Sequence, residues 1–235
     1  MFTTKQRSFA TLRMTNKVWE TNFSVVYLLI FLESKTMTET RIATALMELG
    51  VLVFSLCFHE FGHALAATKL GDPTPKMLGR LTMDPRPHVD PIGTLLFPMI
   101  MFLYPGFFLF GWARPVPITP QNFKKPRRDG ALVALAGPTM NLILVAVSFM
   151  IFIGVQYFSF FGLDDASVDV VGRFFQFFFL LNAALAVFNL VPIYPLDGSW
   201  ILKAVLPPKW SYQVSRLDPY GFFILLGLFF LLRWL

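Results

Sequence analysis

Long apolar segments, separated by short charged loops, dominate this sequence of 235 residues. A helix that spans a bilayer needs about 20 consecutive apolar residues. The chain is 55% hydrophobic and only 14% charged, which is more apolar surface than a soluble domain of this size could bury. The sequence therefore predicts an all-α polytopic membrane protein with about five apolar segments. They run from about Ile42 to Leu70, Pro91 to Trp112, Gly130 to Phe161, Val170 to Val191, and from Pro219 onward.

The loops between these segments carry charges that indicate sides of the membrane. Residues 69–90 and 114–128 are basic, whereas residues 157–171 hold Asp and neither Lys nor Arg. Lys and Arg collect in cytoplasmic loops, so both basic stretches should be cytoplasmic and the second segment cannot be a simple crossing. Its Pro105-Gly106 favours a re-entrant or broken element. Lys and Arg cluster in loops beside the apolar segments, so the net charge of +6 predicts no nucleic-acid partner.

Two further regions lie outside the long apolar segments. Residues 74–90 hold several prolines, each of which disfavours helix in the residue before it, so we expect a small extended or β-like element there. Residues 1–36 are basic, rich in Ser and Thr, and unlike the rest of the chain. We interpret them as a dispensable N-terminal extension, with Met37 as the working start and 37–235 as the functional domain. The alternative is that residues 1–36 guide the first helix into the membrane.

Two histidines and a glutamate interrupt the first apolar segment, in the stretch VLVFSLCFHEFGHALAATKLGD. His59, Glu60 and His63 form the pattern HExxH. Residues four apart lie on one face of a helix, so both imidazoles can reach one metal ion beside Glu60. A five-residue pattern recurs by chance, but ionisable residues inside membrane segments are costly and usually functional. The position of the pattern therefore favours a zinc site.

A third ligand can be sought by elimination. No Glu follows Glu60, and the position for a third histidine six residues after the motif is Lys69. Asp197, in NLVPIYPLDGSW, is the only acidic residue between Asp169 and Asp218. It follows an apolar segment that should end at the same depth as the histidines. A plain turn residue before a glycine is the alternative interpretation of Asp197.

The remaining polar residues allow more than one interpretation. Asn189 could hold the substrate carbonyl or the developing oxyanion, or it could cap the end of its helix. Gly137 and Asn141, in AGPTMN, favour close helix packing over chemistry. His88 favours a structural polar contact, since it lies outside any metal-binding spacing.

These motifs together resemble the site-2 protease family of intramembrane zinc metalloproteases, in its short bacterial form. The resemblance covers about residues 42–232 and rests on HExxH, GRLTMDPRPHVDPIGTLLFP, FGWARPVPITPQNF, AGPTMN and NLVPIYPLDG. It implies one Zn²⁺ per chain, bound by His59, His63 and Asp197, with Glu60 and Asn189 as catalytic residues. Larger members carry a soluble insertion of the PDZ type, for which no polar stretch here is long enough.

The resemblance also implies an activity and a location. The expected function is hydrolysis of transmembrane segments of other membrane proteins, by a water that zinc activates and from which Glu60 takes a proton. The expected location is the lipid bilayer of the bacterial inner membrane, as a multi-pass protein. Two alternatives are a transporter, which would usually show two related halves, and a non-catalytic zinc-binding scaffold, which would not need Glu60.

Overall fold

All regular secondary structure is helical, with no strand, within the residues that the structure describes. The structure, a computed structural model, describes residues 39–104, 111–159 and 165–234, so the expected N-terminal extension lies outside it. The α-helices are α2 (Glu39–Lys69), α3 (Thr74–Met77), α4 (Phe97–Leu103), α5 (Pro126–Ser159), α6 (Asp165–Asn189), α7 (Asp197–Val205), α8 (Pro208–Ser215) and α9 (Gly221–Trp234). Short π- or 3-10-helical turns are η1 (Pro91–Leu96), η2 (Pro120–Asn122) and η3 (Asp218–Tyr220).

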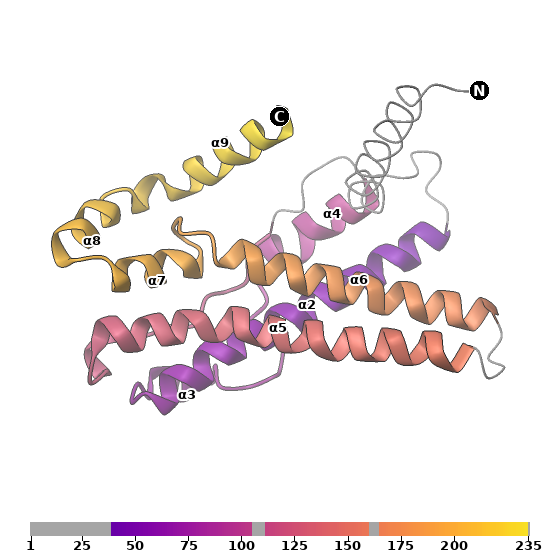
Figure 1. Cartoon of the computed structure of the whole chain (residues 1–235), viewed down its shortest axis with the longest axis horizontal. Helices are drawn as coiled ribbons and strands as arrows, with labels where there is room; N and C mark the ends of the chain where they lie inside the picture. Colours follow the sequence, from indigo (N-terminus) through magenta and orange to yellow (C-terminus); the bar gives the residue numbers. More distant parts are fainter. Residues whose placement is uncertain (1–38, 105–110, 160–164, 235) are drawn as a thin grey trace, which may run out of the picture.

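Three long helices, α2, α5 and α6, form the centre of the molecule. In Figure 1, α5 and α6 run side by side in opposite directions and α2 crosses them. Each has a stretch long and apolar enough to cross a membrane: Arg41–Lys69, Pro126–Tyr157 and Val168–Asn189. A buried cluster at their contact is made of Val51, Leu52, Leu144, Phe178 and Leu181. The prediction of an all-α membrane protein is therefore confirmed for the described residues.

Within the described residues, two of the five expected apolar segments form helices that are shorter than a span. The second segment forms η1 followed by α4, and together they reach only from Pro91 to Leu103. The last segment forms α9, whose 14 residues measure about 21 Å, less than the hydrocarbon core of about 30 Å. Pro105 and Gly106 lie outside the described residues, so re-entry of the second segment stays a prediction.

The expectation of an extended or β-like element at residues 74–90 is wrong. Residues 74–77 form helix α3, and turns and bends follow it, including a left-handed Gly79 with φ of +67°. Backbone carbonyl groups in this region accept hydrogen bonds from an arginine side chain instead of from a neighbouring strand. The buried Arg80 guanidinium donates hydrogen bonds to the carbonyl oxygens of Pro87, Arg114 and Pro115. Proline lacks an N–H, so this proline-rich stretch could not have formed a regular ladder.

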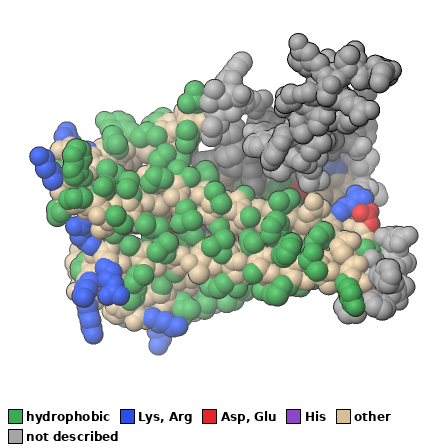
Figure 2. Space-filling view, viewed as in Figure 1, with side chains coloured by type: hydrophobic (Ala, Val, Ile, Leu, Met, Phe, Trp, Pro, Cys, Tyr) green, Lys and Arg blue, Asp and Glu red, His purple; other side chains and the backbone are tan. Residues whose placement is uncertain are grey.

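The two basic stretches lie at the same end of the helix bundle. The end of α2, helix α3 and the start of α5 meet there, together with α7 and α8 (Figure 1). Figure 2 shows that Lys and Arg gather mostly at this end, while the flanks of the bundle are largely apolar. The ion pair of Asp169 with Arg173, at 2.5 Å, lies near the start of α6. The basic loops and Asp169 therefore lie at different ends of the bundle, as expected for a membrane protein with cytoplasmic basic loops.

A buried carboxylate, Asp72, ties the end of α2 to the segment before α5. Its oxygens accept hydrogen bonds from the Thr119 N–H at 2.7 Å, the Asn122 amide at 2.7 Å and the Thr74 N–H at 3.1 Å. Burial alone would raise the pKa of this carboxyl. The hydrogen bonds from Thr74, Thr119 and Asn122 outweigh burial and hold the pKa below its usual value.

Asp72→Ala should destabilise the fold by about 1–3 kcal/mol, because it leaves several buried donors without acceptors. The lowered pKa makes this contribution pH-dependent. It is fully present above the unfolded pKa of about 3.9 and is lost as the pH falls below that value toward the folded pKa. Thermal unfolding in detergent measures the difference from the native chain at each pH. Asp84→Ala is the control, since Asp84 pairs only with its neighbour Arg86. Equal unfolding temperatures for the two variants at pH 7 would contradict this role.

Candidate metal centre

Three side chains from two helices converge in the interior, beside the basic end of the bundle. His59 and His63 lie one turn apart on α2, and Asp197 is the first residue of α7. The Nε2 atoms of the two histidines are 3.1 Å apart. They lie 3.1 and 3.3 Å from the two carboxylate oxygens of Asp197. The histidines are 5% and 7% exposed, so the group is shielded from solvent.

The Nδ1 atom of each imidazole forms a hydrogen bond with an oxygen. His63 Nδ1 lies 2.8 Å from the Val133 carbonyl oxygen, and His59 Nδ1 lies 2.6 Å from Asn141 Oδ1. Both oxygens only accept hydrogen bonds, so both Nδ1 atoms carry the proton. The Nε2 atoms then present lone pairs toward the carboxylate. Asp197 Oδ2 is buried and has no hydrogen-bond partner. When both rings are neutral, three acceptors therefore face one another, an arrangement that a cation stabilises.

The spacing of these three groups suits a tetrahedral metal ion. Bonds of about 2.0–2.2 Å, as zinc makes to nitrogen and oxygen, give tetrahedral edges of about 3.3–3.6 Å. The observed separations are at or slightly below that range: 3.1 Å between the two Nε2 atoms, and 3.1 and 3.3 Å from these atoms to the Oδ2 and Oδ1 atoms of Asp197, respectively. Among the described residues, His59, His63 and Asp197 are the group of metal-ligating side chains whose ligand atoms lie this close together. The donor set therefore fits a zinc ion with a fourth position left over.

A glycine on α5 makes room for the imidazoles. A Cβ atom added at Gly137 would lie 2.7 Å from His59 Cε1 and nearer still to His63 Nε2. The backbone of α5 can lie against the rings only because this residue has no side chain. Gly62 plays a similar part in the helix contact, since its Cβ would meet Met140 Cγ at 2.6 Å. The interpretation of Gly137 as close packing holds, and its packing partners are His59 and His63.

Asp197 reaches the histidines through a tight turn after α6. Residues 190–196 turn the chain back, and α7 packs on α5. A Cβ at Gly198 would lie 2.5 Å from the Val191 carbonyl oxygen, so the turn closes only with glycine at this position. Asp197 and Gly198 could also be interpreted from the sequence as a plain turn. In the structure, this turn places the Asp197 carboxylate beside the two histidines.

Glu60 is buried beside this group, with 8% exposure. Its Oε2 accepts a hydrogen bond from the Val116 N–H at 3.1 Å. Val116 follows the residues whose carbonyl groups Arg80 holds, so the buried guanidinium fixes the backbone that orients Glu60. Glu60 is absent from the group of close metal-ligating atoms. This arrangement suits a base held near a metal rather than a ligand.

The other candidate residues, Asn189 and His88, contact backbone carbonyl groups. Asn189, the last residue of α6, is half-buried, and its amide donates to the Leu185 carbonyl oxygen of its own helix at 3.0 Å. This contact is compatible with the capping interpretation and leaves the oxyanion role a prediction. His88 is buried and its Nε2 donates to the Thr82 carbonyl oxygen at 3.0 Å, as a structural contact would.

Sequence reasoning missed the contact of Asn141 with His59. The residue was interpreted as helix packing, yet its carbonyl oxygen binds the imidazole directly. One signal was available in the sequence, because an amide in the middle of an apolar segment needs a partner. The sequence does not show which face of α5 meets α2, and so it could not name that partner.

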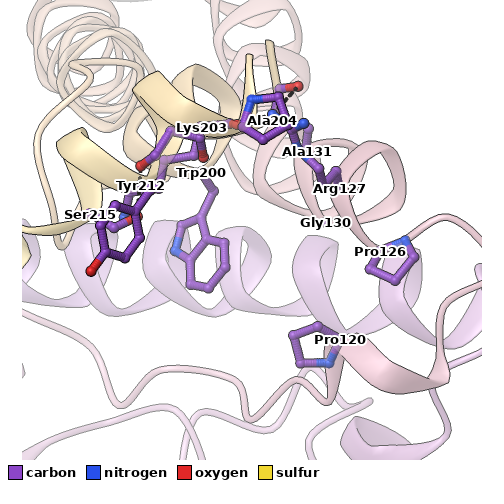
Figure 3. A pocket seen from close by; sticks show the side chains of 12 residues that line it. Pro120, Pro126, Arg127, Gly130, Ala131, Trp200, Lys203, Ala204, Tyr212 and Ser215 are labelled. Atoms are coloured by element: carbon purple, nitrogen blue, oxygen red, sulfur yellow. Dashed lines mark hydrogen bonds between the residues drawn. The ribbon is translucent and has the colours of Figure 1, made fainter. Parts of the chain in front are cut away.

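A cavity of about 440 Å³ lies elsewhere, between the start of α5 and helices α7 and α8. Trp200 and Tyr212 line one side and Pro120 and Pro126 the other (Figure 3). Its cationic side chains already have partners. Arg127 donates to the Lys203 carbonyl oxygen at 2.8 Å, and Lys203 pairs with Asp218 at 2.6 Å. The lining includes no member of the HExxH motif and not Asp197, so the cavity is distinct from the candidate metal centre.

Gly137→Ala should abolish metal binding, because the added methyl group would occupy the space of the imidazoles. Overpacking of this kind costs about 1–3 kcal/mol, which the site can relieve only by moving its ligands. Elemental analysis of the purified protein gives the metal content. Gly154→Ala on the same helix is the matched control, since a Cβ there meets nothing within 4 Å. Full metal content in both variants would show that the glycine is not required.

Comparisons with known proteins found a peptidase family and relatives named as metalloproteases. Residues 163–228 match the family model described as peptidase family M50. The chain is 40% identical over 180 residues to "Putative zinc metalloprotease YwhC" of Bacillus subtilis, across 76% of this chain and 77% of that protein. It is 34% identical over 179 residues to Rip2 of Mycobacterium tuberculosis, which carries the same description, across 74% of this chain and 63% of that protein.

A more distant relative also bears a metalloprotease name. Zinc metalloprotease MJ0392 of Methanocaldococcus jannaschii is 27% identical over 168 residues, across 71% of this chain and 37% of that protein. No solved structure matches the chain. The similarity to YwhC extends over most of both proteins, and with the family match it shows that this chain belongs to peptidase family M50, the site-2 protease family.

Proposed function

We propose that this chain is a zinc-dependent intramembrane endopeptidase that hydrolyses transmembrane segments of other membrane proteins. The observation that carries the proposal is the meeting of two imidazoles and a carboxylate at 3.1–3.3 Å in a buried site. The names of the relatives, which are zinc metalloproteases, agree with the donor set. Membership of the site-2 protease family supports a substrate within or near the bilayer.

Each residue at the site would have a separate role in peptide hydrolysis. His59, His63 and Asp197 would hold one zinc ion, which when bound lowers the pKa of a water molecule and polarises a peptide carbonyl. Glu60 would take the proton from that water and deliver it to the leaving amine. The Val116 N–H holds one Glu60 oxygen at 3.1 Å and so orients the carboxylate for this transfer. Asn189 would bind the substrate carbonyl, once its amide leaves Leu185.

The position of the site supports cleavage near the cytoplasmic face. The HExxH motif occupies the last turns of α2 before Lys69, at the end of the bundle where Lys and Arg gather (Figure 2). That end would be cytoplasmic by the positive-inside rule. The chain would then be a multi-pass protein of the bacterial inner membrane. Its second apolar segment would enter and leave on one side, and residues 37–235 would suffice for activity.

Two other functions are less well supported by these observations. A transporter would carry intramembrane polar residues, but it would not need a base beside a ligand set with an open position. A non-catalytic zinc scaffold would need the three ligands alone, whereas Glu60 is buried and held by a backbone N–H. The buried carboxylate that ligates nothing is the feature that separates a protease from both.

Glu60→Gln should keep its zinc and its fold but lose about 10²–10⁴-fold in cleavage rate, because it removes the general base. The Gln carbonyl can still accept from the Val116 N–H, so the local structure should survive.

Asn189→Ala should also keep its zinc and lose about 10²–10³-fold in cleavage rate, the usual cost of one oxyanion donor. Cleavage of single-span membrane proteins by purified protein in bilayers, measured beside zinc content, distinguishes these outcomes.

Asp197→Ala should lose both zinc and activity, since it removes a ligand. His88→Ala is the matched histidine control and should keep its zinc, because its ring contacts a backbone carbonyl and not the site. A wild-type cleavage rate for Glu60→Gln would rule out the protease mechanism. Full zinc in Asp197→Ala together with loss of zinc in His88→Ala would overturn the ligand assignment.

A further inference from the structure

We propose that Asn141 is a positioning residue that holds His59 in the tautomer and orientation needed for metal binding, and that Asn182 and Ser55 hold Asn141 in turn. These four residues, His59, Asn141, Asn182 and Ser55, are called the amide relay below. The inference rests on the proposed function, since it takes His59 to be a zinc ligand. It adds residues from all three long helices to the machinery of the site.

The relay begins at a backbone carbonyl on α6. The Asn182 amide nitrogen donates to the Phe178 carbonyl oxygen at 2.9 Å and to Ser55 Oγ at 2.9 Å. The Phe178 carbonyl can only accept, so it fixes which end of the Asn182 amide points toward it. The Asn182 oxygen is thereby turned toward α5, where it accepts from the Asn141 amide nitrogen at 2.9 Å.

The orientation passes from one amide to the next and ends at the imidazole. With its nitrogen bound to Asn182 and near the Ser55 carbonyl, Asn141 must present its oxygen to His59 Nδ1, at 2.6 Å. That oxygen accepts only, so His59 carries its proton on Nδ1 and leaves Nε2 free to face the metal. A flip of the Asn182 amide would set its oxygen against the Phe178 carbonyl oxygen and its nitrogen against the Asn141 nitrogen, and a flip of Asn141 alone would set its oxygen against the Asn182 oxygen.

The two histidines are held in different ways. His63 Nδ1 donates directly to the backbone carbonyl of Val133, which no substitution removes. His59 depends on side chains from two other helices. Ser55, Asn141 and Asn182 are each 0% exposed, although buried amides within a membrane segment are expensive unless fully bonded. Packing alone could be met by apolar side chains, so orientation of His59 is the better explanation of these residues.

Asn141→Leu should weaken zinc binding by about 10–100-fold, the usual effect of losing the hydrogen-bonding partner of a ligating histidine. Purified protein in detergent is titrated with Zn²⁺ against a competing chelator, and the absorption spectrum of the Co²⁺-substituted protein reports the ligand geometry. Asn141→Asp keeps an oxygen for His59 Nδ1 and should recover most of the affinity. Asn182→Leu should cause a smaller loss, because the direct contact to His59 survives.

Ser148→Ala is the matched control. Ser148 is a buried polar residue on the same helix, but it donates only to carbonyls of that helix, at 2.7 Å to Leu144. The control should bind Zn²⁺ with native affinity and give the native Co²⁺ spectrum. Residues that serve only as contacts between helices would lower the unfolding temperature of the metal-free protein and leave both of these readouts unchanged.

Three outcomes decide the question. Native zinc affinity and an unchanged Co²⁺ spectrum in Asn141→Leu would overturn the positioning role while leaving the proposed function intact. Native zinc affinity in His59→Ala would instead overturn the proposed metal site. If Asn141→Leu does not fold, Asn182→Leu applies the same criterion, and native affinity and spectrum in that variant would overturn the relay.

Discussion

The whole structure depends on bringing three hydrogen-bond acceptors together in a buried place. The Nε2 atoms of His59 and His63 and the carboxylate of Asp197 lie 3.1–3.3 Å apart, with both imidazole protons on the far side of the rings. Without a cation the three lone-pair groups repel one another in surroundings of low dielectric. A divalent ion reverses the sign of that interaction and makes the same arrangement stable.

Each long helix serves this arrangement in its own way. Helix α2 supplies the histidines, α5 supplies Gly137, whose missing side chain admits the rings, and α6 leads into the turn that carries Asp197. The loops at the basic end of the bundle contribute indirectly. Arg80 holds the backbone next to Val116, whose N–H in turn holds Glu60. The apolar outer faces of the helices serve the bilayer, so the polar chemistry is confined to the inside of the bundle.

Whether a contact could be predicted from the sequence depends on how far apart its residues lie along the chain. The HExxH residues share one helix, so helical periodicity alone places both imidazoles on one face. Asp197 was accessible by elimination, and the structure brings it to the histidines, although its role as a ligand stays a prediction. The extended element at 74–90 was predicted wrongly, because proline spacing shows where helix is disfavoured but not that Arg80 would bind the carbonyls. The contact of Asn141 with His59 depends on how α5 rotates against α2, which a single sequence does not contain.

The central claim is most directly tested by X-ray absorption at the zinc edge of the purified protein. We predict one zinc whose ligands are two imidazole nitrogens and oxygen, at about 2.0–2.2 Å, with no sulfur. The chain's single cysteine, Cys57, is buried on the same helix and is not part of the ligand group. A spectrum with a sulfur ligand, or with fewer than two imidazoles, would contradict the account.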